Sequence, residues 1–256
     1  GDIDVDGTSN LDIVDIDGAV DMASTLVVAS TINTVGITGP KTNFVGSMLI
    51  SNDAGTGTLN AASNNTGVGV DVFAALTTGD DNVAVGKSAL TANTTGHSNT
   101  SVGASSLDAN TTGIRNTALG FESLSANTEG TQNTAVGKGA LLVNTTGIEN
   151  TGIGASALDA NTTGDYNTAV GQGALDSITT GNYNTAIGRS ALTTLTTNAA
   201  NTAVGGTALS ANTAANNTAV GYAALAANTS GTENVAVGAL AGDALTTGSR
   251  NTAVGY

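Results

Sequence analysis

The chain of 256 residues lacks several residue types on which most folded proteins depend. It contains no Cys, no Trp and a single Pro, and aromatic residues make up only 3% of it. The absence of Cys excludes a disulfide scaffold and Cys-ligated zinc or iron–sulfur sites. Charged residues amount to 10%, against about 25% in an ordinary domain. The shortage of large side chains argues against a thick globular core, and the shortage of charges argues against ordinary disorder.

Basic residues and long apolar runs are also scarce. Six Lys and Arg stand against twenty Asp and Glu, which gives a formal net charge of −14. Nucleic-acid binding needs basic patches, so we expect no nucleic-acid partner. No apolar run approaches the roughly 20 residues of a membrane-spanning helix, so we expect no membrane insertion.

The chain does have an internal repeat. A block related to Asn-Thr-Ala-Val-Gly begins at twelve positions between Asn65 and Asn251. Ten of the eleven spacings are 17 residues, and the spacing from Asn201 to Asn217 is 16. We number the repeat from this Asn as position 1. Position 3 is always small, position 4 is always aliphatic, position 5 is always Gly, and position 9 is Leu in nine of the eleven complete units.

The repeat length and pattern predict an all-β fold. Seventeen residues are too few for a helical hairpin of about 34 or a propeller blade of about 40, but they suit one coil of a solenoid. The Thr-x-Val alternation at positions 2–4 predicts a short strand, and Gly at position 5 allows a turn with positive φ. A second turn follows at positions 12–15, where we expect a left-handed Gly, or Asn198 in its place. The segment at positions 5–9 is either a second strand or a helical turn. We therefore expect a parallel β-solenoid, or β-roll, of 17-residue coils.

The repeat also predicts what stabilises the stack. Coils about 4.8 Å apart would each bury the aliphatic residue of position 4 and the Leu of position 9 in a narrow core. The Asn residues of position 1 would form ladders of side-chain amides. The residues expected to build these structural ladders are Asn82, Asn99, Asn116, Asn133, Val85, Val136, Gly86, Gly137, Leu90 and Leu141.

The chain divides into three parts. Residues 1–37 alternate aliphatic and acidic residues and are interpreted as a β-rich acidic N-terminal stem. Residues 38–64 are rich in Gly, Ser, Thr and Asn and are interpreted as a transition. Residues 65–256 form the β-solenoid of about twelve repeats.

The acidic stem contains the one pattern that points to a metal. Asp2, Asp4 and Asp6, followed by Gly7, match the first half of a calcium-binding loop. Ile13 stands where the loop needs its last acidic ligand, so a solvated strand face is the preferred interpretation. The three Asp residues are weak metal candidates, which three-fold rings in a trimer would strengthen. We expect no cofactor.

Exposed aromatic residues recur at fixed repeat positions. Tyr166 and Tyr183 share the last position of consecutive units, and Phe121 and Tyr222 share position 6. Such residues are candidate surface contacts, either between subunits or with a sugar, and subunit contact is the preferred reading. Glycoside hydrolysis would need two carboxylates about 5–10 Å apart in distinct environments. The acidic residues of the repeats are scattered over variable positions and no Trp is present to stack on a sugar, so we do not expect an enzyme.

The unit from Asn150 to Gly164, Asn-Thr-Gly-Ile-Gly-Ala-Ser-Ala-Leu-Asp-Ala-Asn-Thr-Thr-Gly, resembles repeats of phage tail fibres and related bacterial surface proteins. It is also similar to the head repeats of trimeric autotransporter adhesins, whose unit is a shorter Asn-Ser-Val-Ala-Ile-Gly type. Those heads form left-handed parallel β-rolls in trimers. The resemblance covers about three-quarters of the chain. It implies an intertwined or side-by-side homotrimer, and it bears on architecture more than on function.

Together these observations predict the structural shaft of a phage tail fibre or a similar extracellular appendage, which projects a host- or surface-binding region. The expected partners are two further copies of the chain, other fibre or virion proteins, and a host-surface glycan or protein. The expected location is a virion tail fibre, or else the extracellular space or a cell surface. Three alternatives stay open: a trimeric bacterial adhesin head, a polysaccharide-degrading tailspike and an ice-binding solenoid.

Overall fold

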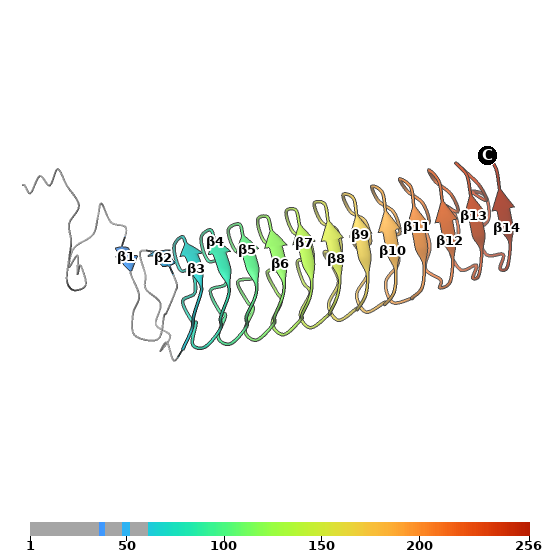
Figure 1. Ribbon diagram of the computed structural model, residues 1–256. Coiled ribbons are helices and arrows are strands. Elements are labelled where there is room, and N and C mark those ends of the chain that lie inside the picture. The colour runs from blue at the N-terminus through green and yellow to red at the C-terminus, as the bar shows by residue number, and fades with distance from the viewer. Residues whose placement is uncertain (1–35, 39–47, 52–60) are drawn as a thin grey trace, which may run out of the picture.

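The computed structural model describes residues 36–38, 48–51 and 61–256, which form one sheet of fourteen strands (Figure 1). Strand β1 (Gly36–Thr38) pairs antiparallel with β2 (Met48–Ser51), and β2 pairs in parallel with the first strand of the repeats. The strands of the repeats are β3 (Thr66–Val68), β4 (Val83–Val85), β5 (Thr100–Val102), β6 (Thr117–Leu119), β7 (Thr134–Val136), β8 (Thr151–Ile153), β9 (Thr168–Val170), β10 (Thr185–Ile187), β11 (Thr202–Val204), β12 (Thr218–Val220), β13 (Val235–Val237) and β14 (Thr252–Val254).

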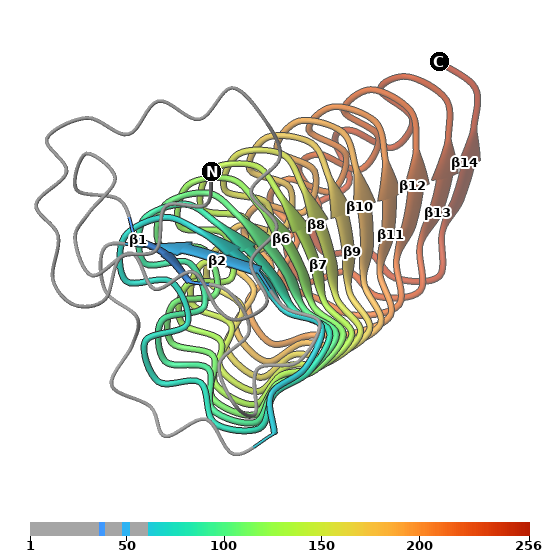
Figure 2. The same ribbon diagram turned by 60° about the vertical axis from the view of Figure 1, so that its left-hand side comes forward.

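The predicted parallel β-solenoid of 17-residue coils is confirmed. Each repeat contributes one strand, and each strand from β3 to β14 pairs in parallel with the equivalent strand of the next coil. Viewed closer to its axis, the stack shows each coil lying over the next (Figure 2). The 16-residue coil keeps the register, because Thr202 still pairs with Thr218. The missing residue falls between Asn212 and Asn217, in the turn where the sequence places it.

The rest of each coil consists of turns, so the segment at positions 5–9 is neither a strand nor a helical turn. Positions 7, 9 and 17 adopt the left-handed conformation throughout the stack, with φ between 50° and 64°. These positions hold residues such as Ser156, Leu141 and Tyr166 as well as glycines. The expectation of a left-handed residue at position 15 is wrong, since neither its glycines nor Asn198 has a positive φ. Glycine at this position gives space between regular coils, since a Cβ on Gly113 would lie 2.5 Å from the carbonyl oxygen of Gly130. Asn198 takes the position in the coil that precedes the 16-residue coil.

The interior of the solenoid differs from the prediction at one column, where a column denotes one repeat position in successive coils. Position 3 points inward and position 4 points outward, so Val85 and Val136 are not core residues. The small residues of position 3 meet those of position 8 across the coil. In one coil both are Ser, and their hydroxyl oxygens lie 2.5 Å apart (Ser101 and Ser106). This part of the interior therefore has no room for Val, and the Leu residues of position 9 fill the wider part.

Candidate functional site

The outer face of the sheet is the most continuous surface feature of the described chain. Positions 2 and 4 of every coil point outward and are half-buried or exposed. Position 2 is Thr in ten coils and Val in two, and position 4 is Val, Ile or Leu in all twelve. Leu119 is 48% exposed and Ile187 is 41% exposed. The result is a face with one column of mainly hydroxyl-bearing residues and one aliphatic column.

The amide ladder predicted for position 1 is confirmed, and Asn82, Asn99, Asn116 and Asn133 all belong to it. The backbone N–H of Asn133 donates to Asn116 Oδ1 at 2.9 Å, and the N–H of Asn150 donates to Asn133 Oδ1 at 2.9 Å. The Asn133 side chain also donates to the carbonyl of Gly147 at 2.8 Å. Each buried Asn thus satisfies a backbone group in its own coil and one in the next, which is a structural role.

A second amide ladder, at position 12, was not predicted from the sequence. Asn127 Nδ2 donates to Asn110 Oδ1 at 2.8 Å, and Asn144 Nδ2 donates to Asn127 Oδ1 at 3.0 Å. Four of the eleven coils carry Leu or Ile at this buried position instead. Where Ile178 follows Asn161, the oxygen Asn161 Oδ1 is buried without a hydrogen-bond partner. The available signal was the exchange of Asn for aliphatic residues of similar size, which indicates an interior position.

The glycines and leucines predicted to be structural have that role. Leu90 and Leu141 are fully buried. Gly86 and Gly137 have φ of 134° and 130°, and a Cβ on Gly137 would lie 2.7 Å from the carbonyl carbon and oxygen of Gly154. Position 5 therefore requires Gly for its conformation and for the close approach of the next coil.

The aromatic candidates are exposed, as expected for surface residues. The rings of Tyr166 and Tyr183 are stacked, with centroids 5.0 Å apart and an interplanar angle of 4°. Phe121 and Tyr222 both lie at position 6 but six coils apart, and Tyr222 lies two coils from Tyr256 in the same column. Their exposed fractions are 48% and 64%. The structure thus brings together the two tyrosines and leaves Phe121 and Tyr222 as single exposed rings.

Partly buried carboxylates lie at position 10. Burial raises the pKa of Asp108, and the nearby Glu122 carboxylate raises it further. Burial also raises the pKa of Asp159, and the Asp176 carboxylate in the equivalent position of the next coil adds to this effect. Hydrogen bonds from side chains and backbone oppose both shifts. The pKa values of Asp108 and Asp159 are thus raised by partial burial and by neighbouring carboxylates.

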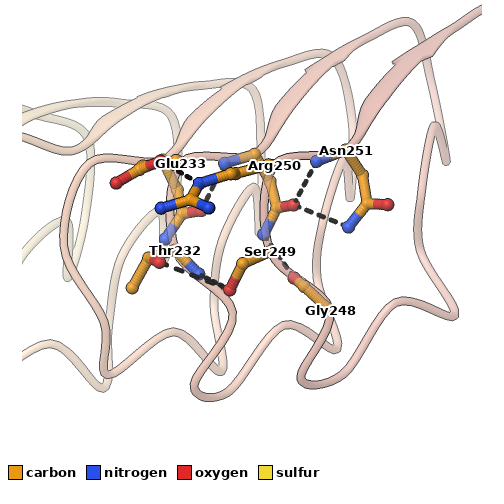
Figure 3. Close-up of polar contacts among 8 residues, drawn as sticks. Thr232, Glu233, Gly248, Ser249, Arg250 and Asn251 are labelled. Atoms are coloured by element: carbon orange, nitrogen blue, oxygen red, sulfur yellow. Dashed lines mark hydrogen bonds and ion pairs between the residues drawn. The ribbon is translucent and has the colours of Figure 1, made fainter.

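Polar contacts between neighbouring coils repeat at the C-terminal end of the stack (Figure 3). Asn251 donates from its backbone N–H to Asn234 Oδ1 at 2.9 Å, and Asn234 donates from Nδ2 to the carbonyl of Gly248 at 2.8 Å. Arg250 Nε lies 2.8 Å from Glu233 Oε2, the one ion pair within residues 61–256. The side chains of Arg250 and Glu233 are both exposed, so their ion pair contributes little to stability.

Asp2, Asp4 and Asp6 lie outside the described residues, and the described part of the chain contains no group of three or more His, Cys, Asp or Glu arranged to hold a metal ion. Within the same part, no helix has the length and apolar character needed to cross a membrane.

Comparison with other proteins does not assign the chain to a family. It matches no model of a known protein family, no curated protein and no solved structure.

Proposed function

We propose that this chain is the shaft of a homotrimeric fibre, a phage tail fibre or a similar extracellular appendage, and that it projects a host- or surface-binding region. The observation that carries the proposal is the outer face of the sheet. It presents an unbroken aliphatic column along all twelve coils, each member half-buried or exposed. Extended apolar surfaces of this kind are usual where copies of a chain associate.

The construction of the stack suits a stiff spacer. Backbone hydrogen bonds join successive coils at every strand and also in the turns, as where Leu141 N–H donates to the Ala157 carbonyl at 2.9 Å. Two interior amide ladders and a row of buried Leu also run along the axis of the solenoid, from coil to coil. Each coil touches only its neighbours, so bending the rod requires many parallel contacts to change together.

The outer face has dimensions that suit subunit contact. Twelve coils at about 4.8 Å give a length of roughly 58 Å, and a three-residue strand is about 10 Å wide. The face thus offers roughly 600 Å² per chain, or about 300 Å² toward each of two neighbours in a trimer, which is less than the ~800 Å² that one partner gives to a standard interface. Side chains at the margins of the sheet supply the remainder. Around a three-fold axis, three such faces shield each other's aliphatic columns.

The absence of Cys from the chain makes a direct test possible. Val136→Cys places one thiol on the outer face, and the matched control Thr163→Cys places one in the exposed turn at position 14. A trifunctional maleimide should convert the Val136→Cys protein, but not the control, into a covalent trimer on a denaturing gel. Equal cross-linking of both variants, or none of Val136→Cys, would contradict the proposed contact.

A second candidate function uses the same face. The Thr and aliphatic columns form a flat, regularly spaced array of hydroxyl and methyl groups, which favours binding to an ordered surface such as ice. An ice-binding protein would keep this face free and would be active as a monomer. Thermal hysteresis of a monomeric protein, abolished by Thr134→Glu on the face and retained in Thr163→Glu, would support this candidate over the fibre shaft.

A further inference from the structure

The stacked tyrosines end at a gap in their column. Tyr166 and Tyr183 occupy position 17 of consecutive coils, and the next coil has Ala200 there, preceded by Ala199. We call the place above these two alanines the open step. Tyr166 covers one face of the Tyr183 ring, and the other face lies toward the open step. The exposed fractions agree with this arrangement, being 63% for Tyr183 and 39% for Tyr166.

The open step has the size of one ring. The following coil places the exposed Asn216 at the equivalent position, two coil rises or about 9.6 Å from Tyr183. A ring held midway would lie about 5 Å from Tyr183, within the range in which rings stack. This matches the 5.0 Å between Tyr166 and Tyr183. A six-membered ring above Ala200 would therefore continue the stack.

Polar groups with free hydrogen-bonding capacity lie on both sides of the open step, with Asn182 one coil before it, Asn216 one coil after it and Asp165 two coils before it. Asp165 Oδ1 accepts the N–H of Ile148 at 2.8 Å, and Asn182 Oδ1 accepts the N–H of Asp165 at 2.7 Å. Within the described part of the chain, Asp165 Oδ2, Asn182 Nδ2 and the side-chain amide of Asn216 make no hydrogen bond. The site thus combines an aromatic face with both donors and acceptors.

This combination fits a saccharide better than a second copy of the chain. A pyranose offers a C–H face to an aromatic ring and hydroxyl groups at its edge to amides and carboxylates. A subunit contact along a repetitive rod would recur in every coil, whereas the stacked tyrosines occupy this position in only two of the eleven complete coils. Elsewhere the same column carries mainly polar residues, among them Asp81, Ser98, Arg115, Gln132 and Glu149.

We infer that Tyr183, supported by Tyr166 and flanked by Asn182 and Asn216, binds a pyranose unit of a neutral glycan at the open step. The ligand is neutral because Glu149 and Asp165 lie beside the tyrosines and the chain carries a net charge of −14. This inference rests on the proposed function, since it names the ligand class that an adhesive fibre would hold along its shaft.

Saturation-transfer NMR with maltohexaose and cellohexaose tests the inference on the full chain. We expect transfer to the sugar ring protons of at least one of these oligosaccharides. Tyr183→Ala should weaken binding roughly tenfold, as loss of one stacking contact would. Ala200→Tyr should block binding with Tyr183 intact, because its side chain fills the open step and position 17 already accepts Tyr at the same φ. Tyr222→Ala, which removes an unrelated exposed ring, should bind as the parent does.

Absence of transfer to both oligosaccharides overturns the inference, and so does binding that survives both Tyr183→Ala and Ala200→Tyr. A tryptophan-containing peptide that binds where neither sugar does would also overturn it, in favour of a protein partner. The sugar-binding test and the test of the trimeric shaft can fail independently of each other. A trimer without sugar binding overturns only this inference, whereas sugar binding by a monomer overturns only the trimeric shaft.

Discussion

The two interior amide ladders make a sharp prediction, because the same substitution in the same coil should have different costs. Asn133 lies at position 1 and Asn144 at position 12, and both are fully buried. We compare Asn133→Leu with Asn144→Leu. The side chains are alike in size, so the difference in stability reports which polar groups lose their partners.

Asn133→Leu removes the acceptor of a buried backbone N–H, that of Asn150, at 2.9 Å. It also removes a 2.8 Å donation to the Gly147 carbonyl, which keeps a 3.1 Å bond from Asn144. An orphaned buried N–H costs about 1–3 kcal/mol and the lost hydrogen bond about 0.5–1.5 kcal/mol. We therefore expect the free energy of unfolding to fall by about 2–4 kcal/mol.

Asn144→Leu should cost about 1 kcal/mol or less, because the buried Leu offsets much of the polar loss. It orphans only a side-chain oxygen, Asn127 Oδ1, and the native chain already contains orphans of the same kind at Asn161 and Asn228. The Gly147 carbonyl keeps its 2.8 Å bond from Asn133.

Urea unfolding followed by circular dichroism measures both variants, and hydrogen exchange locates the effect. The backbone N–H of Asn150 should exchange faster in Asn133→Leu than in the parent protein. In Asn144→Leu its exchange rate should equal that of the parent. Equal destabilisation of the two variants, or a greater loss in Asn144→Leu, would refute the assignment of distinct roles to the two ladders.

Two further predictions concern single positions. Gly137→Ala should prevent normal stacking of its coil, since the added Cβ would lie 2.7 Å from the Gly154 backbone. Gly139→Ser should cost only about 1–2 kcal/mol for its φ of 62°, because the added Cβ has no neighbour closer than 4.0 Å and other coils hold Ser at this position. Thermal unfolding compares them, and equal melting temperatures would contradict the close approach at position 5. Asp159 has a raised pKa in the folded state, so its contribution to stability is full below the unfolded pKa and is lost as pH rises through the folded pKa. Stability of the parent minus that of Asp159→Asn should therefore decrease as pH rises above about 4 in denaturant titrations, and an increase would contradict the raised pKa.

Much of the fold could be predicted because the repeat length sets the coil and the invariant Asn sets the register. The orientation of the strand could not be predicted, since alternation defines two faces without saying which is inside. Hydrophobicity favours Val136 over Ala135 as the core residue. The structure reverses this choice because the interior is narrow beside the strand, as the 2.5 Å approach of Ser101 and Ser106 shows.

The candidate site was predictable in part for similar reasons. Shared repeat positions predicted that Tyr166 and Tyr183 lie together, and the structure shows them stacked. The left-handed conformation of positions 7 and 9 was hidden, because these positions usually hold side chains such as Ser and Leu. Only Gly139, Gly173 and Gly242 among them signalled a positive φ.

The mass of the unmodified chain in solution tests the central claim most directly. Sedimentation equilibrium at several protein concentrations should give about three times the chain mass of 24.7 kDa, with no dependence on concentration in the working range. Such a trimer would bury the aliphatic columns that the isolated chain exposes. A mass that stays at 24.7 kDa across the same concentrations would contradict the trimeric shaft and leave the outer face of the sheet free for another ligand.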